Sequence, residues 1–170
     1  MVKQDPSPST NQQHTEFATA LSDNKALLLK AIQQTKICLH WYSSGLDPLI
    51  ANNMDIYQAF LELYKNNRKI KFKLLVHQTQ EVMRKGHCLI PLIQRLSSAF
   101  EVKKTDAEYA KRDYATYLIV DKKIIYYRSI ETQWEGRLEM DNSYQAKQLM
   151  IQFETVWALS SIDSQLRRLI

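Results

Sequence analysis

Two histidines lie where an α/β protein could bind an anion. His77 ends a predicted parallel strand, and Ser43 and Ser44 follow another. The carboxyl ends of such strands line the ligand crevice of open α/β sheets. His87 begins a predicted helix, whose free backbone N–H groups favour negative charge, and Arg84 lies just before it. These residues predict a phosphate-binding site, although a histidine that caps a helix or packs in a core gives the same pattern.

Metal and cofactor sites are not predicted. His77, Glu81, His87 and Cys88 lie close in sequence, but their spacing matches no zinc pattern. The chain has no Cys-x-x-Cys pair, no nucleophile elbow, no phosphate loop and no dinucleotide-binding glycine pattern. We therefore expect no metal, no cofactor and no nucleophilic triad.

The first hundred residues alternate between helical and extended patterns. Apolar residues at helical spacing predict one helix that begins near residue 22, a second over 54–66, and a third that follows Gly86 and His87 and stops at Ser97 and Ser98. Short apolar runs predict strands at 36–42, 70–77 and 100–103. This order is typical of a parallel sheet with crossover helices.

The second half changes its periodicity. Three predicted strands, 114–120, 124–128 and 133–140, are joined by short turns and should be antiparallel. A final helix opens at 141–143 and places one apolar stripe toward the core. The fold class expected is α/β, with a mixed sheet, parallel in its first half and antiparallel in its second, flanked by helices. It forms one domain, 21–170, after a flexible segment, 1–20, rich in Pro, Ser, Thr, Asn and Gln.

The sequence from residue 114 onward resembles the phospholipase D superfamily. Its signature is His-x-Lys, four residues, Asp, six residues, then Gly-Ser-x-Asn, followed by a helix that ends in Phe and Trp. When the signature Asp is placed on Asp121, the other positions fall on Tyr114 (His), Thr116 (Lys), Arg128 (Gly), Ser129 (Ser) and Glu131 (Asn). The resemblance covers roughly residues 24–165 and implies the fold of one phospholipase D half-domain.

That resemblance implies a family chemistry that these residues cannot perform. The nucleophile would be Tyr114, but a phenol is mostly protonated at neutral pH, and Thr116 brings no positive charge to a phosphoryl group. Glu131 would bring a negative charge toward it. On a strand, Tyr114 and Thr116 would share a face, where they form either a remodelled ligand pocket or core packing.

The chain also resembles an uncharacterised bacterial family with a degenerate domain of this kind. The motif residues are Gly86, His87 and Leu89 before a helix and Arg95, Leu96 and Ser98 after it. The candidate ligand-binding residues are therefore His87, His77, Arg84, Arg95, Ser98 and Arg128.

Charge and composition add a bias toward acidic partners. The formal net charge is +5, and a basic run contains Lys65, Arg68, Lys69, Lys71 and Lys73. This run indicates either a nucleic-acid or anionic-lipid surface or an edge strand protected by lysines. The sequence has no apolar stretch of about 20 residues and no secretory signal pattern, and its two cysteines are far apart. We expect a cytoplasmic protein that is not an integral membrane protein.

The sequence is compatible with three functions. The first is a non-catalytic binding or scaffold domain of unknown partner. The second is a phosphodiesterase or nuclease with a rearranged histidine site, formed as a homodimer across a two-fold axis. The third is nucleic-acid or anionic-surface binding through the basic run. The first is favoured, because the signature residues are replaced.

Overall fold

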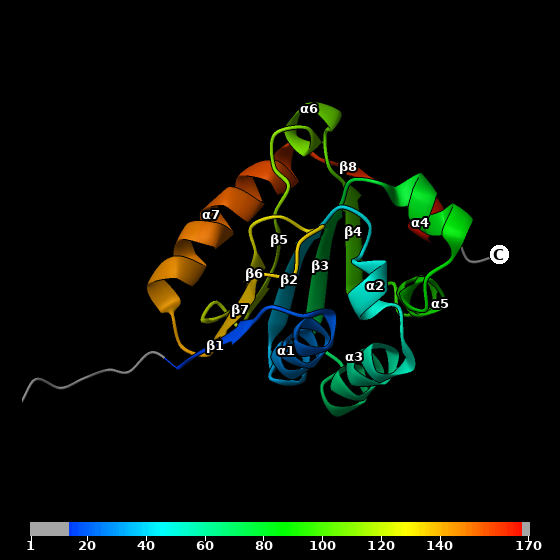
Figure 1. The fold of residues 1–170 in the computed structure, drawn as a ribbon. Helices are drawn as coiled ribbons and strands as arrows, with labels where there is room; N and C mark the ends of the chain where they lie inside the picture. Colours follow the sequence, from blue (N-terminus) through cyan, green and yellow to red (C-terminus); the bar gives the residue numbers. More distant parts are fainter. Residues whose placement is uncertain (1–13, 168–170) are drawn as a thin grey trace, which may run out of the picture.

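One eight-stranded sheet organises the fold of the computed structural model, which describes residues 14–167 (Figure 1). The strand order is β1-β7-β6-β5-β2-β3-β4-β8. The strands are β1 (Thr15–Ala18), β2 (Cys38–Ser43), β3 (Lys71–Val76), β4 (Phe100–Lys104), β5 (Thr116–Val120), β6 (Ile124–Arg128), β7 (Gly136–Glu139) and β8 (Ser161–Ile162).

The predicted division of the sheet is confirmed. β2, β3 and β4 are parallel neighbours, whereas β5, β6 and β7 form an antiparallel meander that joins β2 through β5. Parallel strands end at the same edge, so the chain leaves β2, β3 and β4 side by side at one end of the sheet. Open α/β sheets place their ligand crevice at this end of the strands.

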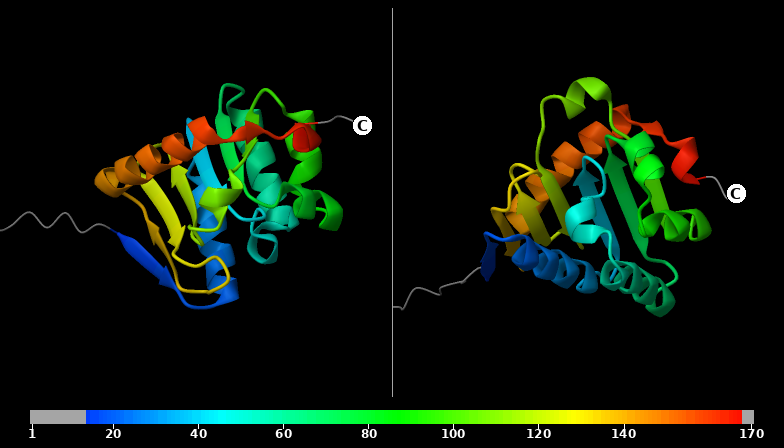
Figure 2. Two further views of the ribbon diagram at one scale, coloured as in Figure 1. Left: turned by 90° about the horizontal axis from the view of Figure 1, so that it is seen from above. Right: turned by 45° about the vertical axis from the view of Figure 1, so that its right-hand side comes forward.

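Helices cover both faces of the sheet (Figure 2). One face packs against α1 (Leu21–Gln33), α2 (Pro48–Ala51), α3 (Met54–Asn66), α4 (Thr79–Lys85), α5 (Leu89–Arg95) and α8 (Ser164–Arg167). The other face packs against α7 (Ser143–Leu159), while α6 (Ala107–Ala110) lies beyond the strand ends.

Strand alternation divides the apolar residues between two cores. Leu39 and Trp41 of β2 point to the face covered by α1, and Tyr42 points to the face covered by α7. Helices α3 and α7 each begin at an asparagine whose side chain caps the helix. Asn53 Oδ1 accepts a hydrogen bond from Ile56 N at 3.1 Å at the start of α3, and Asn142 caps α7 in the same way.

The structure corrects several boundaries. Thr15–Ala18 form β1, which pairs with β7, so the flexible segment expected over 1–20 is wrong for these residues. Residues 1–13 lie outside the described part. The strand expected at 133–140 is shorter, because 129–135 form a loop between β6 and β7.

The prediction that the lysines protect an edge strand is also wrong. β3, which carries Lys71 and Lys73, lies between β2 and β4 inside the sheet. The edges are β1 and β8 instead. Within residues 14–167, no helix combines the length and apolar character that a membrane crossing requires.

Candidate functional site

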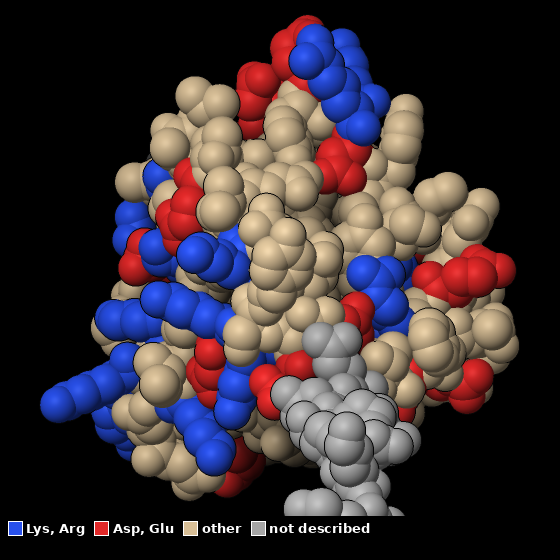
Figure 3. Space-filling model, turned by 90° about the vertical axis from the view of Figure 1, so that its left-hand side faces the viewer, with Lys and Arg blue, Asp and Glu red and all other residues tan. Residues whose placement is uncertain are grey.

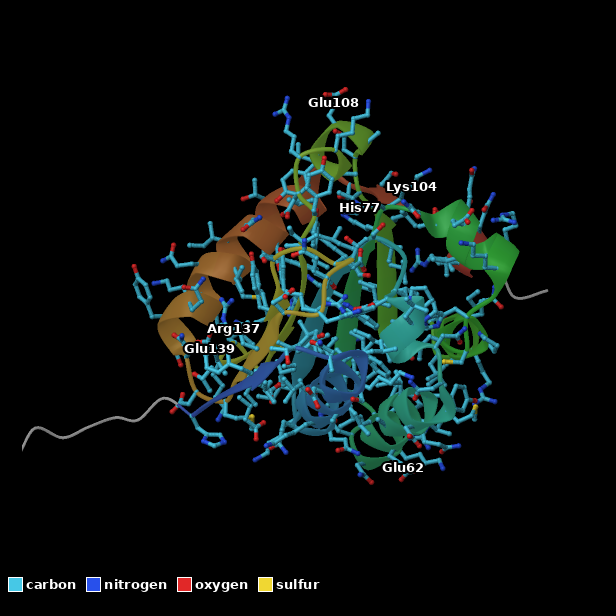
Figure 4. The ribbon with its side chains drawn as sticks, in the orientation of Figure 1. Glu62, His77, Lys104, Glu108, Arg137 and Glu139 are labelled. Atoms are coloured by element: carbon cyan, nitrogen blue, oxygen red, sulfur yellow. The ribbon has the colours of Figure 1, made fainter. Side chains whose placement is uncertain are left out.

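A cleft of about 560 Å³ opens at the carboxyl ends of β2, β3 and β4. We call it the strand-end cleft; its lining includes Ser44, His77, Lys104, Lys111, Tyr114 and Glu131. His77 and Lys104 lie at this end of the sheet, below the α6 segment that carries Glu108 (Figure 4). The fold thus brings together the ends of three parallel strands and the loop that follows β6.

Glu131 uses both carboxylate oxygens at this sheet end. Its Oε1 accepts a hydrogen bond from Ser43 Oγ at 2.7 Å, and its Oε2 accepts one from Ser44 N at 3.0 Å. Burial raises the pKa of Glu131, whereas the bonds from Ser43 and Ser44 and the charge of Arg128 act in the opposite direction. The polar donors at the end of β2 are therefore satisfied from within the chain.

Arg128 lies in the interior next to this loop. Its side chain is fully buried, and its Nη2 donates to Asp47 Oδ2 at 2.7 Å and to the carbonyl oxygen of Glu131 at 2.8 Å. The guanidinium also lies 5.4 Å from the centre of the Trp134 ring. Burial raises the pKa of Asp47 to about 7, although Arg128 acts to lower it. Arg128, a predicted ligand-binding residue, thus holds the loop.

The positions expected to carry the signature His and Lys do not lie side by side. β5 begins at Thr116, so Tyr114 precedes the strand, is 68% exposed and lines the strand-end cleft. The prediction of a core tyrosine is wrong. Thr116 is fully buried, as the packing alternative predicted, and donates to the Tyr42 carbonyl oxygen at 3.0 Å.

His77 lines the cleft and has no hydrogen bond to its ring in the described part of the chain. The ring packs edge-on against Tyr42, with 5.0 Å between the ring centroids. Burial lowers the pKa of His77, while the charge of Asp113 raises it. An enclosed imidazole without a partner is costly, because its polar atoms have lost water without a replacement.

Both ring nitrogens of His87 form hydrogen bonds with backbone atoms. Its Nε2 lies 3.0 Å from the Leu46 carbonyl oxygen, and its Nδ1 accepts from Leu89 N at 3.2 Å, so the ring proton is on Nε2. It lines a pocket of about 270 Å³ with Asp47 and Trp134, and this pocket adjoins the strand-end cleft, because Ser44 and Glu131 line both. His87 is therefore engaged with the backbone and is not among the residues that line the strand-end cleft itself.

The remaining predicted ligand residues do not converge on the cleft. Arg84 pairs with Glu81 at 2.7 Å on the exposed side of helix α4. Arg95 ends α5, and its Nη2 lies 3.4 Å from Tyr57 Oη. The Ser98 carbonyl oxygen accepts a hydrogen bond from Lys71 Nζ. Arg95 and Ser98 precede β4 and so lie at the opposite end of the parallel strands.

Asp121 and Ser129 are the signature positions that match in residue type. Asp121 accepts hydrogen bonds from the backbone N–H groups of Lys36, Ile37 and Cys38 at 2.8 to 2.9 Å. It follows β5, at the end of the sheet away from the cleft. Ser129 is exposed just after β6. Asp121 thus connects the β5–β6 turn to the start of β2 through hydrogen bonds.

Sequence reasoning missed Lys104, Thr105 and Lys111. Lys104 ends β4 and Thr105 follows it, so the rule that identified His77 at the end of β3 also identifies them. Thr105 is buried and lines the cleft, and its Oγ1 has no partner in residues 14–167. Those residues also bring no three His, Cys, Asp or Glu side chains together in a metal-binding group.

Solved structures place this fold among phospholipase D-like domains. The phospholipase D family member Nuc from Salmonella typhimurium has a TM-score of 0.63 at 14% identity, with 91% of this chain and 99% of that chain covered. NucT from Helicobacter pylori has a TM-score of 0.63 at 12% identity, covering 88% and 99%. The archaeal chromatin protein TrmBL2, described with a novel mode of DNA binding, has a TM-score of 0.62 at 13% identity and 92% coverage of this chain. This chain spans 57% of TrmBL2.

The sequence comparison then gives the family. Residues 20–169 match DUF7931, described as a domain of unknown function, and the chain belongs to that family. A comparison with curated proteins finds no match.

Proposed function

We propose that this chain is a non-catalytic binding domain with a phospholipase D-like fold. The observation that carries the proposal is the position of the Glu131 carboxylate at the end of β2. Both of its oxygens accept hydrogen bonds there, one from Ser43 Oγ and one from Ser44 N. A phosphoryl group needs donors and positive charge at such a sheet end. Here an internal carboxylate takes the donors and adds negative charge.

The reacting groups support the same conclusion. Phosphodiester cleavage by this superfamily needs an imidazole nucleophile, a second imidazole as general acid and a lysine on the phosphate. Tyr114 is exposed, the Thr116 hydroxyl donates to a backbone carbonyl, and both ring nitrogens of His87 are engaged with backbone atoms. Among the described residues, His77 is the one histidine that lines the strand-end cleft.

Several polar groups of the strand-end cleft favour a small anionic ligand. Lys104 and Lys111 line it and form no ion pair within residues 14–167. His77 and Thr105 lack hydrogen-bond partners there, and the exposed Tyr114 ring offers an apolar contact. Such a set suits a carboxylate or phosphate monoester on an aromatic or apolar body.

A turnover screen with a matched variant tests the proposal. We expect the purified protein to leave bis(p-nitrophenyl) phosphate, single-stranded DNA and phosphatidylcholine vesicles intact. Hydrolysis that copurifies with the protein and disappears in His77→Ala, but persists in His87→Ala, would establish the phosphodiesterase alternative. Activity retained in both variants would indicate a contaminant.

A second candidate is single-stranded nucleic-acid binding at the same sheet end. The exposed Tyr114 beside Lys104 and Lys111 favours it, since stacking aromatics and basic residues bind single strands. The basic run is less suited, because Lys73 lies over the Trp157 ring and Lys71 donates to Ser98. On the face shown in Figure 3, Asp and Glu side chains lie among Lys and Arg, so it presents no uninterrupted basic surface.

Fluorescence anisotropy with a labelled oligonucleotide separates the two candidates. Nucleic-acid binding predicts an affinity that falls steeply with salt and falls further in Tyr114→Ala. Binding that is absent, or that Tyr114→Ala leaves unchanged, would reject this candidate.

A further inference from the structure

Helix α7 has apolar side chains on the side that faces away from the sheet. Its inner side packs Ala146, Leu149, Phe153, Val156 and Trp157 into the second core. On the outer side, Tyr144 is 75% exposed, Ile151 is 56% exposed, and Ala158 is exposed as well. Tyr144, Ile151 and Ala158 follow one another at intervals of seven residues. Seven residues are about two turns of a helix, so the three side chains lie along one ridge.

A surface helix normally places polar residues along its outermost ridge. Isolated apolar side chains are common on surfaces, but a repeat along the ridge opposite the core is typical of a helix that is covered on both sides. In residues 14–167, α7 is the one long helix on its face of the sheet, and no described element covers its outer ridge (Figure 2).

The ridge is complementary to itself when two copies lie antiparallel. A two-fold axis at Ile151 places Ile151 against the same residue of the second copy and Tyr144 against Ala158, a large side chain over a small one. The intervening positions, Gln148 and Thr155, continue the alternating three and four spacing of a helix-packing seam.

Charges beside the ridge fit the same axis. Lys147 lies four residues before Ile151 and Glu154 three residues after it, and both lie on one side of the ridge. The two-fold axis therefore brings Lys147 of each copy level with Glu154 of the other. Both side chains also line a hollow of about 790 Å³ beside Ile151, which a side chain of a second copy can enter.

We propose that this protein forms a two-fold homodimer through the outer ridge of α7, with Ile151 on the axis. A helix of 17 residues is about 25 Å long, so the contact is at the small end of stable interfaces. The dimer is therefore reversible and depends on protein concentration. The strand-end cleft is not part of this contact.

Sedimentation equilibrium of the full chain, from about 1 µM to about 500 µM, provides the first test. We expect the mean mass to rise from 20.0 kDa toward twice that value. Ile151→Glu should remain at the monomer mass throughout. Met54→Glu is the matched control, because Met54 is an apolar residue of similar exposure, 59%, on a different helix. A wild-type mass that stays at the monomer value, or a dimer that Ile151→Glu leaves intact, overturns the proposal.

Two further variants locate the axis and the charges. Ile151→Cys should give a disulfide-linked dimer under mild oxidation, in which mass spectrometry finds the peptide that carries the substitution joined to a second copy of itself, whereas Met54→Cys should not. Lys147→Glu and Glu154→Lys should each weaken the dimer, and the double exchange should restore it. Glu154 also lies 3.7 Å from Lys73 of its own chain, so failure of the double exchange would show that its charge acts within one chain and would reject the intermolecular pair.

Discussion

The guanidinium of Arg128 and the carboxylate of Asp47 form a buried ion pair, with 2.7 Å between Nη2 and Oδ2. The pair ties β6 to the turn that starts α2, across 81 residues of sequence. Leu46 and Asp47 both have positive φ values, 58° and 46°, in a region that non-glycine residues rarely adopt. The ion pair, together with the His87 contact to the Leu46 carbonyl oxygen, holds this turn in place.

The Asp47 carboxyl gives stability a particular pH dependence. Burial raises its pKa from 3.8 to about 7, so the folded state binds this proton more tightly than the unfolded state does. Its contribution to stability is complete below about pH 4 and is lost as pH rises toward 7, with an upper limit of about 4 kcal/mol. The measurement is urea unfolding at pH 5 and pH 7.5. Asp47→Asn should lose the part of the stability change between pH 5 and pH 7.5 that comes from the Asp47 carboxyl. If wild type and Asp47→Asn show the same change in stability, the assignment to Asp47 is wrong.

Replacing Glu131 by Asn should create phosphate affinity. The change removes a negative charge at the end of β2 and releases Ser43 Oγ and Ser44 N. We expect inorganic phosphate to shift the Ser44 amide resonance of Glu131→Asn at concentrations at which wild type does not respond. Ser129→Ala, an exposed position in the same loop, should behave like wild type. An equal response in all three proteins would mean that Glu131 does not exclude the anion.

The imidazole of His77 should titrate below the value of a free histidine. Burial lowers its pKa from 6.5, and the opposing effect of Asp113 is smaller. Proton NMR of the ring should give a midpoint below 6.5, and an anion bound in the strand-end cleft should raise that midpoint, because it stabilises the imidazolium. A midpoint that phosphate and benzoate leave unchanged would count against the anionic-ligand proposal.

A methyl group at residue 136 should disrupt the network behind the cleft. A Cβ on Gly136 would overlap Asn24 Oδ1, which accepts a hydrogen bond from Tyr126 Oη at 2.9 Å, and would lie 3.1 Å from Arg128 Cγ. We expect Gly136→Ala to lower the free energy of unfolding by about 1–3 kcal/mol. Gly45→Ala is the control, since its nearest contact is 3.8 Å, and it should change stability by less than about 0.5 kcal/mol. Equal effects would show that residue 136 has room for a side chain.

The central strands of the sheet could be predicted from the sequence, because each contains an apolar pattern that is typical of a strand. The run that contains Leu74, Leu75 and Val76 is apolar on both faces, as a buried parallel strand requires. Thr15–Ala18 could not be recognised in the same way. This strand has four residues in a polar stretch, and its pairing with β7 joins residues that are far apart in the chain.

The candidate site was only partly predictable for a similar reason. His77 followed from the strand-end rule. The exposure of Tyr114 depends on a local turn, in which Asp113 Oδ1 accepts a hydrogen bond from Ala115 N at 3.0 Å and delays the start of β5. The bond between Ser43 and Glu131 spans 88 residues and depends on the strand order, which no local pattern contains.

Asp121 shows that a residue at a signature position can serve the fold rather than the chemistry. Its carboxylate gathers three successive amide groups at the start of β2, far from the strand-end cleft, so its replacement would harm the fold whatever the cleft binds. Selection on folding alone is enough to keep such a residue. A search pattern anchored on this aspartate therefore collects proteins that share an architecture, and chemistry has to be judged from the residues at the opposite end of the sheet.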